Sequence, residues 1–318
     1  MVTRAASNAR FDRRVPLGRG GLVRPAFWLA AIALALTLAA RLPLDGRTAT
    51  SIATLVFVGG GMPHGAYDIA LLLRATRLGR RGLSLAVGGY ILIASVMAAL
   101  WIAVPLVALV LFIAVAAVHF GEDWTMLDES LLKVAAGTAI VAVPAIAHPT
   151  DVARLFAEMA GSEDGAMVAR AMIAVAPVAL LVTAVGITIA WRDGARRWAA
   201  ATAIALVALI VAPPVAGFAL YFVFLHSPRH LDDARLALKG VSRPWWLATG
   251  AIMSSLAIGG WLLFAASLSR FLTPDRTAQA FQLLATVAVP HLLFSRWIER
   301  RIEQSGRSSN DLQGRPTS

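Results

Sequence analysis

Residues 168–191 read VARAMIAVAPVALLVTAVGITIAW, a run in which Arg170 is the one charged side chain. A helix needs about 20 predominantly apolar residues to cross the hydrocarbon core of a bilayer, so this run is long enough to span a membrane. Nine further apolar stretches lie along the chain: residues 26–42, 48–73, 84–102, 106–120, 131–147, 198–212, 215–230, 245–268 and 278–298. The sequence therefore predicts an all-α, polytopic transmembrane helical bundle of about ten spans, within a range of about eight to ten.

The composition supports this fold class and limits the chemistry. Of 318 residues, 58% are apolar and only 15% are charged. A soluble domain is closer to half apolar and one quarter charged, so this chain has too little polar surface to cover itself in water. The chain has no cysteine, which excludes disulfides, thiolate metal sites and iron–sulfur clusters. Any metal must be held by histidine, carboxylate or carbonyl groups.

The basic residues predict the topology. The net charge is +11, with 29 Lys and Arg residues. If the ten stretches alternate in direction, all but six of these residues fall on one side, which the positive-inside rule assigns to the cytoplasm. The six on the other side are Arg41, Arg47, Arg154, Arg170, Arg270 and Arg276. This bias indicates membrane topology in place of a nucleic-acid partner, and it puts both termini in the cytoplasm.

Three regions follow from this topology. Residues 1–24 form a basic cytoplasmic leader, residues 25–302 a transmembrane domain that carries an intramembrane metal site, and residues 303–318 a polar cytoplasmic tail. The expected location is a plasma membrane, with the bundle surrounded by lipid.

Five of the six histidines lie in the later parts of four apolar stretches that run in the same direction: His64, His119, His226, His230 and His291. They therefore share the cytoplasmic half of the membrane. Ionisable side chains are expensive to bury there and by default mark a functional site. The sixth histidine, His148, falls at the opposite end of its stretch and is excluded from the site.

The histidines favour a metal centre. His226 and His230 are four residues apart, which places them on one face of a helix. Imidazole ligands without thiolates suit Zn, Cu, Fe or Ni, and the ligand types alone leave that choice open.

Three carboxylates stand close to these histidines in the sequence. Asp68 follows His64 by four residues, and Glu122 and Asp123 follow His119 by three and four. Carboxylates at such spacings are placed to accept the second ring N–H of a ligand and to fix its tautomer.

The stretch that carries His64 is predicted to be broken. His64 precedes Arg74 by ten residues, about 15 Å of helix at 1.5 Å per residue, and so lies deeper than the other histidines. Gly59, Gly60, Gly61, Met62 and Pro63 come directly before it, and Gly and Pro break or kink a helix. Irregular backbone at that depth is tolerated only inside protein or beside a cavity, which predicts the wall of a site.

Four short motifs resemble those of the Brp/Blh family of bacterial and archaeal β-carotene 15,15′-dioxygenases. They are PHGAYD at 63–68, HFG at 119–121, HSPRH at 226–230 and PH at 290–291, in this order over most of the chain. The resemblance implies a non-haem iron enzyme that splits β-carotene at its central double bond with O2 to give two retinal molecules. By motif, the Fe(2+) ligands would be His64, His119, His226 and His230. His291 would be a further ligand or a residue behind the ligands, as would Asp68, Glu122 and Asp123.

The resemblance also implies a carotenoid substrate and a product that a retinal-binding rhodopsin could receive. Aromatic side chains flank the motifs and are candidates to line a tunnel for the polyene: Trp124, Phe218, Tyr221, Phe222 and Phe224. Packing between helices is the alternative role for these side chains.

Other functions remain open from the residues alone. A membrane zinc hydrolase is disfavoured because Ser227 follows His226, so an H-E-x-x-H motif is absent. A haem- or metal-binding protein without carotenoid cleavage, acting as an electron carrier or a transporter, is the remaining alternative.

Overall fold

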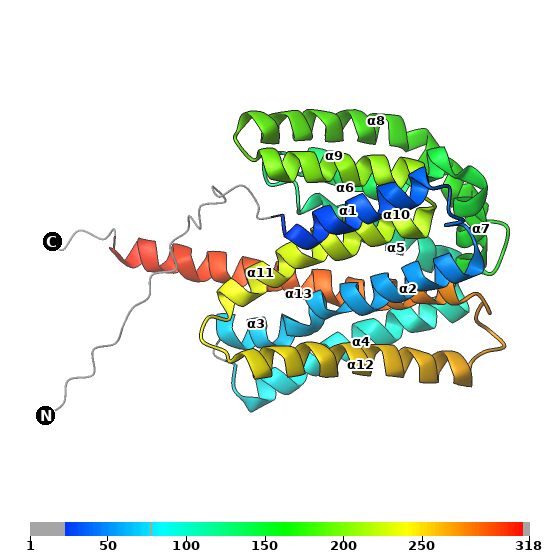
Figure 1. The fold of residues 1–318 in the computed structure, drawn as a ribbon. Helices are drawn as coiled ribbons and strands as arrows, with labels where there is room; N and C mark the ends of the chain where they lie inside the picture. Colours follow the sequence, from blue (N-terminus) through cyan, green and yellow to red (C-terminus); the bar gives the residue numbers. More distant parts are fainter. Residues whose placement is uncertain (1–22, 77, 314–318) are drawn as a thin grey trace, which may run out of the picture.

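A computed structural model describes residues 23–76 and 78–313, with side chains up to residue 297. Every regular element in this part of the chain is helical, which confirms the predicted all-α class (Figure 1). The elements are α1 (Pro25–Ala39), α2 (Arg47–Gly61), η1 (Met62–Tyr67), α3 (Asp68–Ala75), α4 (Arg80–Ala103), α5 (Pro105–Gly121), α6 (Ser130–Ala147), α7 (Pro149–Ala160), α8 (Gly165–Arg192), α9 (Arg196–Val211), α10 (Pro214–Tyr221), η2 (Phe222–His226), α11 (Ser227–Ala237), α12 (Arg243–Ser267) and α13 (Arg276–Gln313).

Each of the ten predicted stretches coincides with one helix or with a run of short helices. Within the described residues, five helices are long and apolar enough to cross a membrane: α4, α6, α8, α12 and residues Arg276–Trp297 of α13. Helices α1 and α5 are apolar but shorter. Large apolar side chains such as Leu29, Leu85 and Leu263 are 68–72% exposed, as expected for a surface that faces lipid.

The sequence analysis did not predict α7. Its apolar residues Val152, Phe156 and Met159 recur every three or four positions between polar ones, so they form one buried stripe and no continuous apolar run. This helix caps the bundle between α6 and α8 and does not resemble a membrane span.

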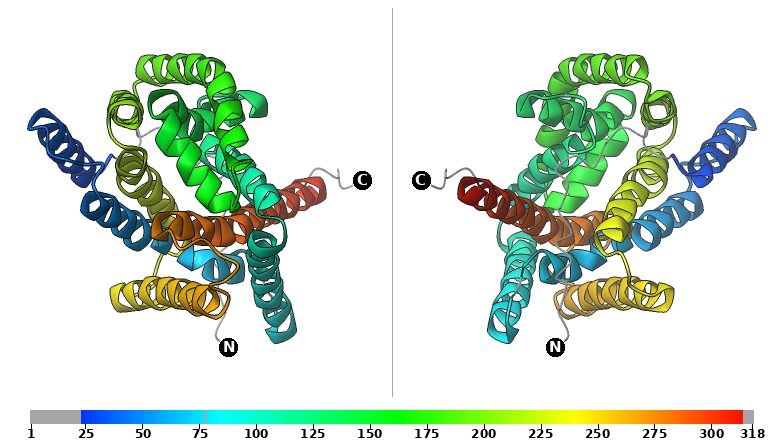
Figure 2. Two further views of the ribbon diagram at one scale, coloured as in Figure 1. Left: turned by 90° about the vertical axis from the view of Figure 1, so that its right-hand side faces the viewer. Right: turned by 90° about the vertical axis from the view of Figure 1, so that its left-hand side faces the viewer.

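Helix α13 forms the centre of the bundle. Figure 2 shows it between α8 on one edge and α12 on the opposite edge. In its apolar window, 72% of the residues are buried, whereas the corresponding share is 11% in α4 and in α12. A side chain on α13 is therefore well placed to meet groups from several helices.

The break predicted before His64 is present. Helix α2 ends at Gly61, the chain continues as a 3-10 helix, and α3 begins at Asp68. Glycine has low helix propensity, and Pro63 lacks the N–H that would continue the α-helical ladder. A Cβ atom on Gly61 would overlap the ring of Phe222, so this glycine also allows η2 to pack directly against the end of α2.

A second break lies in the predicted span 215–230. Here α10 passes into one π-helical turn, η2, and then into α11. Single π-turns inside α-helices occur frequently at functional sites because the extra residue changes the direction of the side chains.

Small residues set the separation of α5 and α6. A Cβ atom on Gly137 would overlap the backbone of Ala117 and Gly121, so glycine is needed where these two helices cross. Close approach through small residues is typical of helices that associate in a membrane. This contact fixes the position of α5, which carries His119.

Candidate metal centre

Three imidazoles from distant parts of the chain converge inside the bundle. His64 lies in η1, His119 near the end of α5, and His226 at the end of η2. One ring nitrogen from each lies within 4.8 Å of the others, and the Nε2 atoms of His119 and His226 are 3.1 Å apart. His119 and His226 are buried and His64 is 9% exposed. Three nitrogen donors at this spacing suit one shared metal ion.

The other two predicted histidines join this cluster. The ring of His230 lies 4.4 Å from that of His226 and 5.1 Å from that of His119, measured between centroids. The ring of His291 lies 5.2 Å from those of both His64 and His119. The structure thus brings together the five histidines that the topology placed in one half of the membrane. The buried Nε2 of His230 makes no hydrogen bond within the described part of the chain and faces Oδ1 of Asp123 at 3.5 Å.

Asp123 organises the side of the cluster formed by η2 and α11. Its Oδ2 lies 2.8 Å from Nδ1 of His226 and accepts a hydrogen bond of 3.1 Å from the hydroxyl of Tyr221. Its Oδ1 lies 3.5 Å from Nε2 of His230, and its carbonyl accepts a bond of 2.7 Å from Arg229. With Nδ1 of His226 engaged by a carboxylate, the Nε2 lone pair of that ring is free to bind an ion.

His119 and His64 are oriented in the same way by groups close to them in sequence. Nδ1 of His119 lies 3.2 Å from Oε2 of Glu122, whose Oε1 accepts a bond from Arg296 on α13. Nδ1 of His64 is hydrogen-bonded to the carbonyl oxygen of Gly61, at the end of α2. Both rings therefore turn their Nε2 atoms away from these acceptors.

Asp68 contacts a different histidine from the one suggested by its spacing. We expected it to accept from His64, four residues earlier. Instead its two oxygens lie 2.8 and 2.9 Å from Nδ1 of His291, and Oδ2 also accepts a bond of 3.2 Å from the Tyr90 hydroxyl. The 3-10 geometry of η1 explains the difference. In an α-helix, residues four apart differ in direction by about 40° and lie on one face, whereas in a 3-10 helix they differ by about 120°, so Asp68 points away from His64.

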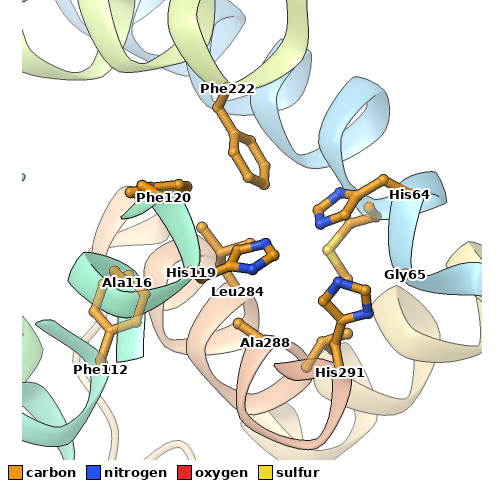
Figure 3. Close-up of a pocket in the computed structure, with 12 residues that line it drawn as sticks. His64, Gly65, Phe112, Ala116, His119, Phe120, Phe222, Leu284, Ala288 and His291 are labelled. Carbon is orange, nitrogen blue, oxygen red and sulfur yellow. The ribbon is translucent and has the colours of Figure 1, made fainter. Parts of the chain in front are cut away.

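An apolar cavity opens directly on the histidines. Its volume is small, about 20 Å³. Figure 3 shows His64, His119 and His291 facing one common space, with Phe120 and Phe222 along its wall. The lining is completed by apolar residues and one glycine: Met62, Gly65, Phe112, Ala116, Leu284, Val287 and Ala288.

The aromatic residues predicted to line a tunnel are divided between several places. Phe222 lines the cavity, whereas Trp124 and Tyr221 line a smaller pocket behind Asp123. Phe218 is a buried member of the hydrophobic core, and Phe224 is partly buried against that core. The cavity residues Phe112 and Phe120, on the same helix as His119, were missed because they stand within an unbroken apolar run.

His148 lies outside the cluster, as expected. It follows α6, and its Nε2 lies 3.0 Å from the carbonyl oxygen of Ile210 at the end of α9. That contact satisfies one ring nitrogen and joins the ends of two helices.

Residues 53–299 match a family model described as Beta-carotene 15,15′-dioxygenase. The chain belongs to this family. The matched residues contain all five clustered histidines and the carboxylates Asp68, Glu122 and Asp123, so the resemblance found in the motifs is confirmed.

Two curated members of the family are similar over most of their length. A Beta-carotene 15,15′-dioxygenase from Uncultured marine bacterium 66A03 is 26% identical over 265 residues, which cover 79% of this chain and 93% of that protein. A Probable beta-carotene 15,15′-dioxygenase Blh from Halobacterium salinarum is 29% identical over an alignment that covers 89% of this chain and 94% of that protein. No solved structure matches the chain.

Proposed function

We propose that this chain cleaves β-carotene at its central 15,15′ double bond with O2 to give two molecules of retinal. The observation that supports this most directly is the histidine cluster at the mouth of an apolar cavity, in a chain of the Beta-carotene 15,15′-dioxygenase family. The reaction balances without another reactant: the C=C bond and the O=O bond break, and two aldehyde C=O bonds form. β-Carotene is an apolar polyene that dissolves in the bilayer. An apolar cavity inside a membrane bundle suits it, because the substrate can enter from lipid and water is kept out.

The proposed cofactor is Fe(2+), with His64, His119, His226 and His230 as ligands and His291 as a further ligand or a residue behind them. The donor set fits, because four of the five rings have Nδ1 against an oxygen acceptor and Nε2 available, and the fifth, His230, has a buried Nε2 that makes no hydrogen bond. When bound, iron supplies the redox chemistry that allows O2 to react with a C=C bond.

The protein's own residues would orient and shield the reactants. Asp123, Glu122 and Asp68 hold the imidazoles in one tautomer and direction, so little reorganisation is needed when the ion binds. Met62, Phe120 and other apolar side chains exclude water from the double bond and hold the polyene against the histidines. No side chain is required as a general acid or base.

The finer topology is part of the same proposal. The ten stretches would form about ten spans of the bacterial inner membrane, with residues 1–24 and 303–318 both in the cytoplasm. A reporter fused to the C-terminus tests this: activity of a periplasm-specific reporter there would overturn the orientation, and activity of a cytoplasm-specific reporter is expected. A retinal-binding rhodopsin would be a functional partner that receives the product.

The test of function is expression in a bacterium that accumulates β-carotene. Cells with the wild-type chain should lose their orange colour and contain retinal, and the His226→Ala variant should retain its carotene. Unchanged carotene in cells that contain folded, iron-loaded wild-type protein would overturn the proposal. An absorption spectrum of the purified protein distinguishes a haem-binding electron carrier from a non-haem iron enzyme, because bound haem would give a Soret band.

A further inference from the structure

Four segments of the chain bring histidines to the cluster. Each of these segments also carries a phenylalanine seven to ten residues before one of its histidines. The pairs are Phe57 with His64, Phe112 with His119, Phe218 with His226, and Phe281 with His291. These positions lie about two to three helical turns before the histidine, at 3.6 residues per turn.

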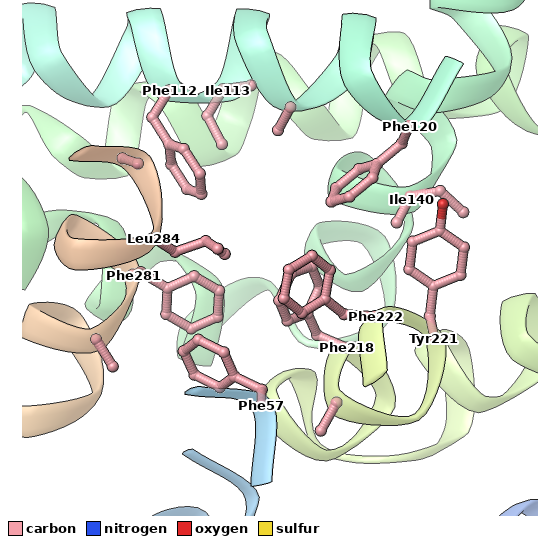
Figure 4. Close-up of a cluster of buried hydrophobic side chains, with 14 of the residues drawn as sticks. Phe57, Phe112, Ile113, Phe120, Ile140, Phe218, Tyr221, Phe222, Phe281 and Leu284 are labelled. Atoms are coloured by element: carbon pink, nitrogen blue, oxygen red, sulfur yellow. The ribbon is translucent and has the colours of Figure 1, made fainter. Parts of the chain in front are cut away.

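The four segments run in parallel, so the four phenylalanines meet as the histidines do. Figure 1 shows α2, α10 and α13 running in the same direction, and Figure 4 shows rings from all four segments around one buried region. The ring centroid of Phe281 is 4.8 Å from that of Phe57, 5.3 Å from that of Phe218 and 6.5 Å from that of Phe112. All four side chains are at most 8% exposed. We call these four residues the aromatic floor.

The cavity lies between the histidines and the aromatic floor. On α5 its wall runs from His119 through Ala116 to Phe112, a rise of about 10 Å at 1.5 Å per residue. On α13 it runs from His291 through Ala288 to Leu284, one turn short of Phe281. Apart from the histidines, the side chains that line it are apolar, so it suits a hydrocarbon chain and offers no partner to a polar end group.

We propose that the aromatic floor acts as a stop for one arm of the carotenoid and so selects which double bond lies beside the histidines. This inference rests on the proposed function and adds the residues that determine where the polyene is cut. A uniform polyene presents many similar C=C bonds, so the position of its end, more than any feature of the bond itself, must determine the cleavage site. Phe281 is the central residue of the stop because its ring neighbours the other three.

The test is the product pattern of Phe281→Ala with β-carotene. Removing the ring opens space behind Leu284, so the arm can enter further and a bond other than the central one reaches the histidines. Wild type should give retinal. The variant should give, in addition, one aldehyde longer than retinal and its shorter partner, with the share of unequal products rising about tenfold or more, the scale on which apolar pocket walls discriminate.

Controls separate a stop from a general packing role. Phe27→Ala removes a fully buried phenylalanine on α1 whose ring packs against Trp28, and it should give retinal alone. Phe281→Leu keeps an apolar side chain and should shift the products in the same direction by a smaller factor, which covers the case in which Phe281→Ala does not fold. Loss of stability alone lowers the yield without changing the ratio of products.

Two failures can be told apart. If wild type makes retinal and both Phe281 variants, folded and iron-loaded, make retinal in the same proportion as wild type, the aromatic floor is not a stop. If wild type makes no retinal, the proposed function itself fails.

Discussion

Replacing Asp123 by Asn should weaken iron binding while leaving the fold intact. Asp123 is 6% exposed, and its Oδ2 receives both the Nδ1–H of His226 and the hydroxyl of Tyr221. An asparagine oxygen at the same place can accept both bonds, so the shape of the site is kept. What changes is the charge, and the amide NH2 now faces Nε2 of His230, 3.5 Å from the present Oδ1.

The expected loss can be worked from these contacts. A hydrogen bond to a charged group contributes about 1.5–3 kcal/mol and a neutral one about 0.5–1.5 kcal/mol. Both bonds already exist without the ion; what the ion adds is its attraction to the charge of Asp123 through His226, and we take the charged-to-neutral difference over the two bonds, about 2 kcal/mol, as the size of that attraction. At about 1.4 kcal/mol per tenfold, this corresponds to roughly 30-fold weaker binding. Substitutions of residues that hydrogen-bond to metal ligands in other proteins give a similar range, about 10- to 100-fold.

The assay is competition for Fe(2+) between the detergent-purified protein and a chelator of known affinity, with thermal unfolding of the metal-free protein as a check on folding. Asp151→Asn is the matched control, because Asp151 is half-exposed and pairs with Arg154 on α7, away from the cluster. We expect the control to bind as wild type does. Equal affinities for wild type and Asp123→Asn, within about twofold, would refute the reasoning, since the charge would then contribute less than one hydrogen bond.

Three further results are expected. His148→Ala should retain iron and carotene cleavage, because its ring bonds to the Ile210 carbonyl outside the cluster; loss of bound iron, measured by metal analysis, would contradict this. Gly137→Ala should destabilise the protein by about 1–3 kcal/mol or more, because its methyl group would overlap the backbone of α5; an unchanged midpoint of thermal unfolding would show that α5 and α6 can separate freely. Gly61→Ala should push the ring of Phe222 toward the cavity and so raise the KM for β-carotene by a larger factor than it lowers iron affinity. Steady-state kinetics and a chelator titration measure the two factors, and a larger change in iron affinity than in KM would contradict this expectation.

The sequence predicts the helical class and the positions of the ten apolar stretches because continuous apolar runs and glycine–proline breaks are local signals. The break before His64 is an example, since three glycines and Pro63 are visible in the sequence. The π-turn at η2 is different. Residues 215–226 read as one apolar helix, and no local pattern marks the extra residue of the turn.

The histidine cluster was predictable because membrane depth limits where ionisable residues can lie. Their carboxylate partners were only partly predictable. Glu122 contacts Nδ1 of His119, as its spacing suggests. Asp68 instead contacts His291, which is 223 residues away in the sequence, and Asp123 contacts His226, which is 103 residues away. Spacing reports neighbours on one regular helix, and both of these aspartates follow a point where the regular α-helix has ended.

The register of the parallel helices links the two ends of the cavity. A shift of α5 by one turn, about 5.4 Å, would remove His119 from a group of nitrogens that now lie within 4.8 Å, and it would also move Phe112 away from Phe281. In the proposed mechanism, metal binding and the choice of double bond therefore depend on the same helix positions. Gly137 sets one of them, because it packs against the backbone of Ala117 and Gly121, which flank His119 on α5. For this reason a substitution there should change the product pattern as well as iron affinity, whereas a substitution confined to Asp123 should change iron affinity alone.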